Sequence, residues 1–188
     1  MISHKHKFIF IHIPKCGGSS IESAFNWTPS SNDNSRHSTM EFYKKKNSHI
    51  DLNNYYKYTF VRNPWDRIVS WYYYHQNGII YRDVTFKDWC KNGFLTHWKG
   101  AGWGNKDPLD CQAWIVDKKE YDFIGKTENL QKGFNTVCDK IGIPRQELPH
   151  ANKSNHGHYT KYYDEETRQI VAEKYAKDIE SFGYKFGE

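Results

Sequence analysis

The chain has 188 residues and a formal net charge of +5, from 27 Lys and Arg against 22 Asp and Glu. This length fits a single domain, residues 1–188, which is large enough to bury a hydrophobic core. The basic charge suits an anionic ligand, although it would also suit a nucleic acid. No apolar run approaches the length of a membrane span and none follows Met1, so we expect a cytoplasmic protein without a membrane span. Four cysteines without paired spacing argue against a zinc site and a disulfide framework.

The first predicted strand, residues 8–13, is a short apolar run that ends at Pro14 and a glycine pair. Apolar residues at helical spacing follow from residue 21, so the glycine loop leads into a helix. Such a loop can offer several backbone N–H groups to an anion. Lys15, Ser19 and Ser20 add a cation and two hydroxyls at the same place. We interpret the loop as a phosphate or sulfate site, with an ordinary glycine turn as the alternative.

The order of residues in this loop excludes two common nucleotide motifs. A nucleoside-triphosphatase loop places its lysine after the last glycine, whereas Lys15 precedes Gly17 and Gly18. The dinucleotide fingerprint Gly-x-Gly-x-x-Gly is also missing.

The second candidate segment lies at the end of a predicted strand over residues 56–61, after a polar loop at 27–36 and a short helix near 38–46. Asn63 is a suitable N-cap for the next helix, and Pro64 fits its first position. Arg62 therefore ends the strand, and Ser70 lies about two turns along the helix, away from its apolar stripe. Both side chains could reach one phosphate. Alternatively, Arg62 pairs with a carboxylate and Ser70 is simply exposed.

The rest of the chain continues the alternation of strands and helices. Residues 77–108 are predicted to be irregular, apart from a short helix near 85–92. A short strand is expected at 121–124, a helix at 130–141 that ends at Gly142, and a final helix capped by Asp164. This alternation favours an α/β layer fold around a parallel sheet.

Together, the two candidate segments resemble those of a known family. Residues 10–20, Phe-Ile-His-Ile-Pro-Lys-Cys-Gly-Gly-Ser-Ser, resemble the 5′-phosphosulfate loop of the sulfotransferases that use 3′-phosphoadenosine 5′-phosphosulfate (PAPS). Residues 60–70, Phe-Val-Arg-Asn-Pro-Trp-Asp-Arg-Ile-Val-Ser, resemble their 3′-phosphate segment. Weaker similarity continues in the family's order to residue 184, and the branch concerned sulfates carbohydrate hydroxyls. The resemblance implies a P-loop-like three-layer fold with a central parallel sheet flanked by helices.

The resemblance also implies a set of site residues. Lys15 would be catalytic, because it meets the charge that develops on the leaving phosphate of PAPS. The residues implied in donor binding are Lys15, Cys16, Gly17, Gly18, Ser19, Ser20, Arg62, Ser70 and Lys153. The product would be 3′-phosphoadenosine 5′-phosphate (PAP), and no metal is expected. The acceptor would be a hydroxyl compound, such as a glycan or small sugar. From its own composition, not from the resemblance, we expect the tryptophan- and glycine-rich stretch 93–104 to select the acceptor; alternatively, its tryptophans pack against the domain.

Two residues are candidates for the general base. His37 matches the position of a histidine that often serves as base in carbohydrate sulfotransferases, and a surface histidine is the alternative. Glu22 is its rival, because related branches use a glutamate on the first helix. His12 belongs to the packed interior or lines the site.

The sequence alone is also compatible with two other functions. A nucleotide kinase would need Mg²⁺ and an aspartate at the end of a strand, and the predicted strands show none. A single-strand nucleic-acid binder would place exposed aromatic residues beside Lys and Arg on a sheet face. The best-organised basic residues lie instead at strand-to-helix junctions, which argues against a nucleic-acid partner. The sequence predicts no oligomeric state.

Overall fold

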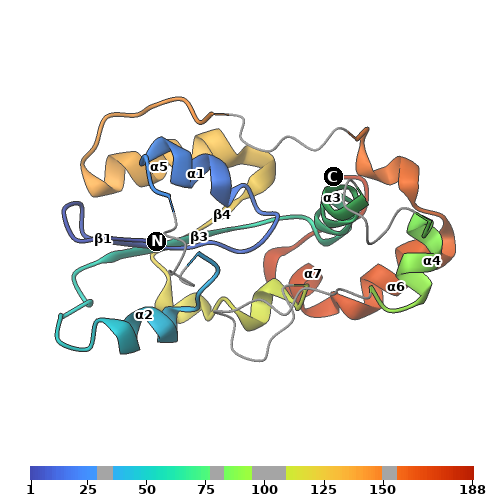
Figure 1. The fold of residues 1–188 in the computed structure, drawn as a ribbon, viewed down its shortest axis with the longest axis horizontal. Helices are drawn as coiled ribbons and strands as arrows, with labels where there is room; N and C mark the ends of the chain where they lie inside the picture. Colours follow the sequence, from blue (N-terminus) through green and yellow to red (C-terminus); the bar gives the residue numbers. More distant parts are fainter. Residues whose placement is uncertain (29–35, 77–82, 95–108, 150–155) are drawn as a thin grey trace. The chain divides into compact units, whose positions relative to one another are not determined.

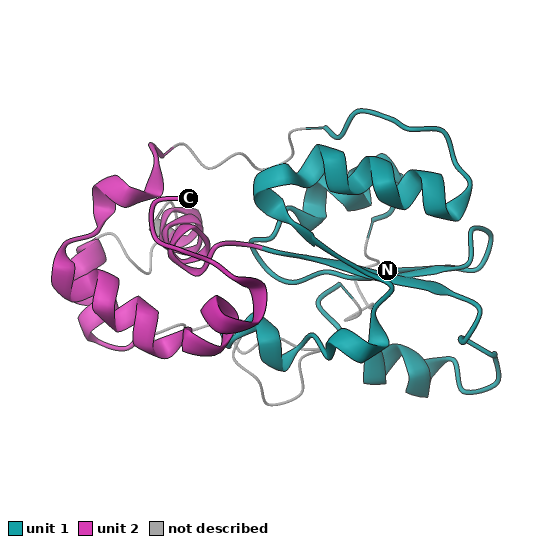
Figure 2. Ribbon diagram, turned by 180° about the vertical axis from the view of Figure 1, so that it is seen from behind, with its two compact units in different colours: residues 1–61, 99–152 teal, residues 62–98, 153–188 magenta. Residues whose placement is uncertain are grey.

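The computed structural model describes residues 1–28, 36–76, 83–94, 109–149 and 156–188 (Figure 1). The chain divides into two compact units, which are described separately (Figure 2). Unit 1 comprises residues 1–61 and 99–152, and unit 2 comprises residues 62–98 and 153–188. The single-domain organisation stays a prediction. No helix in the described ranges is both long and apolar enough to cross a bilayer.

Unit 1 is built on a four-stranded sheet in the order β1–β2–β3–β4. The strands are β1 (Ile2–Ser3), β2 (Phe8–Ile11), β3 (Tyr56–Val61) and β4 (Phe123–Lys126). The pairs β2–β3 and β3–β4 are parallel, with Phe10 opposite Tyr58 and Tyr58 opposite Phe123. The parallel sheet is thus confirmed, with an antiparallel edge strand, β1, that the sequence did not predict.

Helices cover both faces of this sheet. Helices α1 (Gly18–Ala24) and α5 (Leu130–Ile141) lie together on one side of the sheet, and α2 (Met40–Lys46) lies on the other (Figure 1). Alternate residues of β2 and β3 pack against α1 and α5 in one aromatic and aliphatic core, which contains Phe8, Phe10, Tyr58, Phe60, Ile21, Phe134 and Val137. Strands buried on both faces read as continuous apolar runs, as β2 does. The predicted three-layer α/β architecture is confirmed.

The helix ends of unit 1 follow local sequence signals. The hydroxyl of Thr39 accepts the N–H of Phe42 at the start of α2, and α5 ends at Gly142 in the left-handed conformation, with φ 71°. The strand predicted at 121–124 begins two residues later, at Phe123. Asp122 precedes it and bonds Lys57 of β3 twice: its N–H donates to the Lys57 carbonyl at 2.8 Å, and its Oδ2 accepts the N–H of Lys57 at 2.7 Å. Short 3-10 helices at Gln112–Trp114, Lys118–Glu120 and Thr127–Asn129 were not predicted.

Unit 2 is helical, with α3 (Pro64–Gln76), α4 (Phe86–Lys91), α6 (Glu165–Lys174) and α7 (Ala176–Phe182), and a 3-10 helix at Tyr159–Tyr162. Asn63 caps α3 as predicted, since its Oδ1 accepts the N–H of Trp65 at 3.1 Å. Asp164 caps α6 in a capping box with Thr167. The final helix, predicted as one, is broken into α6 and α7 at Tyr175.

Helix α3 is buried on more sides than its sequence suggested. Ser70, on the side predicted to be polar, is only 3% exposed, and Arg67 is fully buried. The alternative of an exposed Ser70 is therefore wrong. On the Trp65 side, α6 and the segment before it pack on α3: Trp65 Nε1 donates to the carbonyl of Arg168 at 3.0 Å, and Tyr163 donates to the carbonyl of Trp65 at 2.8 Å.

The packing of β4 under Phe60 gives a test of this core. A Cβ on Gly125 would lie 2.3 Å from Cε1 of Phe60 and 2.9 Å from Cε1 of Phe123, neither of which can move freely in the core. We expect Gly125→Ala to lower the free energy of unfolding by about 1–3 kcal/mol, the usual cost of overpacking, as measured by urea denaturation. Gly157→Ala is the control, because its nearest neighbours would be 3.8 Å away. Equal stability of the two variants would contradict this packing.

Candidate functional site

The glycine loop connects β2 to α1 with two residues in the left-handed region. Lys15 has φ 66° and Gly17 has φ 77°. A non-glycine residue in this region costs of order 1–3 kcal/mol, and it persists only where its surroundings enforce it. Ser20 N–H donates to Gly17 O at 3.1 Å, and the N–H groups of Gly18 and Ser19 at the helix start have no intrahelical acceptor. The loop can therefore offer these two N–H groups and the Lys15 ammonium to an anion.

Gly18 is required for close packing rather than for its backbone conformation. A Cβ at this position would lie 2.1 Å from Cδ2 of His12 and 2.3 Å from its Nε2. The His12 ring therefore packs directly on the backbone at the first residue of α1. The glycine pair serves two purposes: Gly17 allows the turn, and Gly18 allows His12 to lie against the helix.

Cys16 faces the protein rather than the solvent. Its thiol is buried and donates to Oε1 of Gln112 at 3.1 Å, and its N–H donates to the carbonyl of Ile13 at 3.3 Å. Gln112, from the 3-10 helix Gln112–Trp114, is fully buried and braces the loop from a segment distant in sequence. A role for Cys16 in binding the donor stays a prediction.

Behind the loop lies a buried charged cluster of His12, Glu22 and Arg36. Glu22 is 2% exposed, and its Oε1 accepts from Nδ1 of His12 at 2.6 Å. The other carboxylate oxygen, Oε2, accepts from Nε of Arg36 at 3.0 Å and pairs with Nη2 of Arg36 at 2.9 Å. Nη2 of Arg36 also donates to the hydroxyl of Ser19 in the loop, at 2.9 Å. Burial lowers the pKa of His12, against the opposing effect of Glu22.

His37 lies at the edge of this cluster. Its ring meets that of His12 edge-on, with centroids 4.5 Å apart, and its Nδ1 is 3.2 Å from the carbonyl oxygen of His12. Because a carbonyl only accepts, Nδ1 carries the hydrogen and donates, which leaves Nε2 with the lone pair. Burial, followed by the nearby His12, lowers the pKa of His37 to about 3. His37 is therefore a neutral imidazole at physiological pH, with its hydrogen on Nδ1.

The second candidate segment belongs to unit 2. Nε of Arg62 donates to Oδ2 of Asp66 at 2.8 Å, and both side chains are partly exposed. The carboxylate pairing considered for Arg62 is thus present. An arginine presents its N–H donors in a fixed planar fork, a geometry that suits carboxylate and phosphate oxygens. Ser70 lies two turns along α3 and is buried.

Some predicted features lie outside the described residues. Lys153 lies in the range 150–155, and most of the predicted acceptor stretch lies in the range 95–108. Within the described ranges, no three of His, Cys, Asp and Glu are grouped to hold a metal ion.

The sequence interpretation did not identify the roles of Arg36 and Gln112 around the loop, whereas it placed His12 in the packed interior or lining the site, where it lies. The sequence gave one indication that Arg36 belongs to the site: it is a cation directly before His37, the predicted base. Gln112 had none, because its contact with Cys16 spans 96 positions of the sequence.

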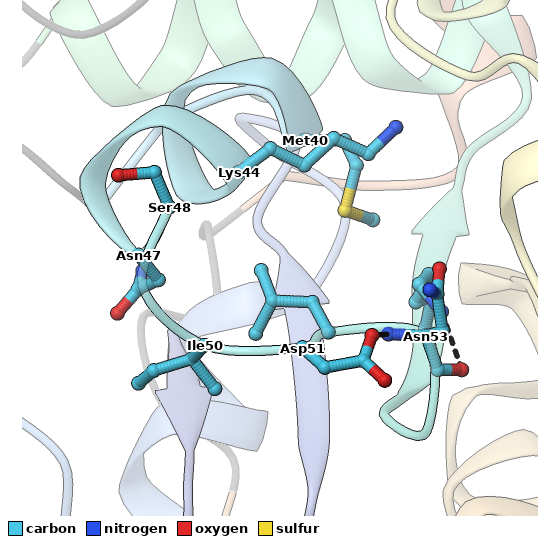
Figure 3. Close-up of a pocket in the computed structure, with 9 residues that line it drawn as sticks. Met40, Lys44, Asn47, Ser48, Ile50, Asp51 and Asn53 are labelled. Carbon is cyan, nitrogen blue, oxygen red and sulfur yellow. Dashed lines mark hydrogen bonds between the residues drawn. The ribbon is translucent and has the colours of Figure 1, made fainter.

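A cavity of about 250 Å³ in unit 1 is separate from this site (Figure 3). It is lined by Met40 and Lys44 of α2, by the segment 47–53, and by Lys57 at the start of β3. The glycine loop follows the end of the parallel neighbour β2, so the cavity and the loop belong to opposite ends of the strands. Its two cations are already engaged: Lys44 pairs with Glu120, and Lys57 Nζ donates to the carbonyl of Tyr55 at 2.9 Å.

The depressed pKa of His37 predicts a dependence of stability on pH. The unfolded chain binds a proton at His37 below pH 6.5, whereas the folded chain does not until about pH 3, so stability is lost as pH falls through this window. From pH 7 to pH 5 the loss from this residue is about 2 kcal/mol. We expect His37→Gln to lose correspondingly less stability over this range in urea denaturation. Parallel losses in the variant and the wild type would contradict a neutral, buried His37.

Comparison with known proteins agrees with this geometry. The model of the sulfotransferase family matches residues 1–185. Human carbohydrate sulfotransferase 9 is 30% identical over 95% of this chain, and the chain spans about half of that protein, 47%. An uncharacterised protein of Archaeoglobus fulgidus is 30% identical over 57% of this chain and 84% of its own length.

A solved structure shares the fold. Mouse sulfotransferase SULT7A1, crystallised in complex with PAP, superposes with a TM-score of 0.59 at 12% identity, over 95% of this chain and 85% of that chain. This likeness confirms the predicted fold. Because the family model covers nearly every residue, the chain belongs to the sulfotransferase family.

Proposed function

We propose that this protein transfers a sulfuryl group from PAPS to a hydroxyl of a carbohydrate acceptor. The observation that carries the proposal is the loop from His12 to Ser20, which places Lys15 and the start of α1 in one tight turn and holds His37 through the carbonyl of His12. Membership of the sulfotransferase family, a carbohydrate sulfotransferase among the relatives and a structural neighbour solved with PAP support it. A metal-free reaction and a cytoplasmic location stay predictions.

Lys15 is proposed to stabilise the leaving group. Sulfuryl transfer resembles phosphoryl transfer, in which catalysis comes mostly from positioning and charge stabilisation. As the S–O bond breaks, its electron pair goes to the 5′-phosphate of the product PAP. Removing one preorganised donor to such charge costs roughly 3–4 kcal/mol, whereas a helix terminus contributes on the order of 1 kcal/mol. Lys15 should therefore matter more than the short helix α1, and the N–H groups of Gly18 and Ser19 assist it.

Arg62, Ser70 and Lys153 are proposed to bind the 3′-phosphate. Arg62 is a cation directly after β3, and the planar guanidinium group suits a phosphate. The resemblance of residues 60–70 to the family's 3′-phosphate segment is the more specific support.

His37 is proposed as the general base. The acceptor oxygen attacks sulfur with its own lone pair, and Nε2 of His37 takes the hydroxyl proton as the new O–S bond forms. The hydrogen bond from Nδ1 to the carbonyl of His12 fixes the tautomer that this step needs. Glu22 is a poorer candidate, because both of its oxygens already accept hydrogen bonds within the protein.

Ligand preference tests the donor assignment. We expect PAP to raise the melting temperature without metal, by the equivalent of roughly 2.7 kcal/mol at one hundred times its dissociation constant. AMP, which lacks the 3′-phosphate, should stabilise less. A larger response to ATP with Mg²⁺ would indicate a kinase, and a larger response to an oligonucleotide would indicate a nucleic-acid binder.

Two substitutions separate the two ends of the donor. Lys15→Ala should reduce turnover by at least about 10²-fold, whereas Arg62→Ala should weaken PAP binding and remove the preference for PAP over AMP. Lys45→Ala and Arg168→Ala are matched controls, because both side chains are exposed on helices outside the proposed site. Retention of the 3′-phosphate preference in Arg62→Ala would overturn its assignment.

Turnover of a His37 variant tests the base. Loss of a positioned base reduces rate by about 10²–10⁴-fold, so His37→Ala should lose this much turnover while still binding PAP. Release of PAP from PAPS with a panel of sugars is the assay. The exposed His49 gives the control, His49→Ala. Normal turnover by His37→Ala at neutral pH would show that another group accepts the proton.

A further inference from the structure

Arg36 is held in place on one side of its guanidinium only. Its Nε and Nη2 donate to the Glu22 carboxylate and to the Ser19 hydroxyl, at 2.9 to 3.0 Å. Within the described part of the chain, Nη1 and its two N–H groups have no acceptor. The side chain is 38% exposed, so solvent or a ligand can reach it. Arg36 is thus a cation held in a fixed position, and the two N–H groups of its Nη1 can donate to a ligand.

The location of this cation points to an anionic ligand. Ser19, which Arg36 contacts, belongs to the loop that carries Lys15 and the two N–H groups at the start of α1. The next residue along the chain is His37, the proposed base. A guanidinium is always charged, and the two N–H groups of Nη1 can donate to phosphate or sulfate oxygens while Nε and Nη2 keep their partners. Arg36 therefore lies where the anionic 5′ end of a donor would be bound.

Glu22 is built to hold this arginine rather than to take part in proton transfer. A buried carboxylate is stable only when its oxygens are paired or hydrogen-bonded. Each oxygen of Glu22 has such a partner, His12 on Oε1 and Arg36 on Oε2. A base needs an oxygen that faces the reacting hydroxyl, and the Glu22 side chain is only 3% exposed.

We propose that Arg36 is a second cation of the donor site, which binds the 5′-phosphosulfate group, and that Glu22 is the positioning residue that orients it. This inference rests on the proposed function, because it assigns the cation to the same donor. The alternative is an ion pair that only stabilises unit 1.

Binding of three nucleotides by Arg36→Gln separates these roles. The ligands are PAPS, PAP and adenosine 3′-phosphate, which lacks any 5′ group, and titration calorimetry gives their dissociation constants. Because Arg36→Gln loses a charge-assisted hydrogen bond, the dissociation constants of PAPS and PAP should rise by roughly 10- to 100-fold. Adenosine 3′-phosphate should bind equally to variant and wild type. Arg36→Lys, which retains the charge without the fork, should fall in between.

The controls make each outcome decisive. Arg168→Gln should bind all three nucleotides as the wild type does, and melting without ligand shows whether each variant is folded. The inference would be overturned if Arg36→Gln bound PAPS and PAP with unchanged affinity while Lys15→Ala bound them more weakly. That result would not contradict the proposed function. Failure of the wild type to bind PAP or PAPS would instead overturn the proposed function itself.

Glu22→Gln distinguishes positioning from general base catalysis. As a positioning residue, Glu22 acts through Arg36, so Glu22→Gln should weaken PAP binding, and the double variant should be no weaker than Arg36→Gln within about twofold. A general base does not alter the affinity for PAP. If Glu22→Gln loses turnover while its affinity for PAP is unchanged, the positioning role is overturned. If Glu22→Gln fails to fold, because Glu22 is buried, Arg36→Gln still tests the cation assignment, since Arg36 is more exposed.

Discussion

The buried carboxylate of Glu22 is the constraint around which the candidate site is organised. A charge at 2% exposure must be compensated, and here the compensation comes from two directions, the His12 imidazole and the Arg36 guanidinium. His12 lies at the end of β2, Glu22 on α1, and Arg36 on the segment before α2, so one carboxylate ties three elements of unit 1 together. The proposed base is a neighbour of this cluster, because the backbone of His12 accepts the hydrogen bond of His37.

Close packing at the loop depends on the same residues. The ring of His12 fits against α1 only because Gly18 has no side chain, and the left-handed Lys15 is held by a loop whose next residue, Cys16, is anchored to Gln112. Strain of this kind is a feature of preorganised sites, where the surrounding structure enforces an otherwise unfavourable backbone. An anion entering such a loop would find its donors already in place, and preorganised donors are worth more in catalysis than flexible ones.

The two candidate anion-binding segments share one structural origin. Each begins where a parallel strand ends, β2 for the glycine loop and β3 for Arg62. In open parallel sheets, ligands bind beyond the carboxyl ends of the strands, because the loops there are free to vary while the sheet stays fixed. The cavity beside Lys57 belongs to the opposite end of β3, which explains why a concave surface in unit 1 need not mark the site.

The sequence by itself determined the local elements, since their signals are local. Apolar runs predicted β2 and β3, and Asn63 and Asp164 were recognisable as helix caps. The glycine pair after Lys15 predicted a loop between β2 and α1. Only the tertiary structure decided the rest: the burial of Ser70, the antiparallel β1, the break at Tyr175, the bracing of Cys16 by Gln112, and the ion pair of Glu22 with Arg36. Those features depend on contacts between elements, whose free energy is set by which surfaces meet. The residues next to each other in the sequence do not show which surfaces meet. Glu22, a candidate base on the sequence, is therefore seen to be a buried partner of Arg36 only in the structure.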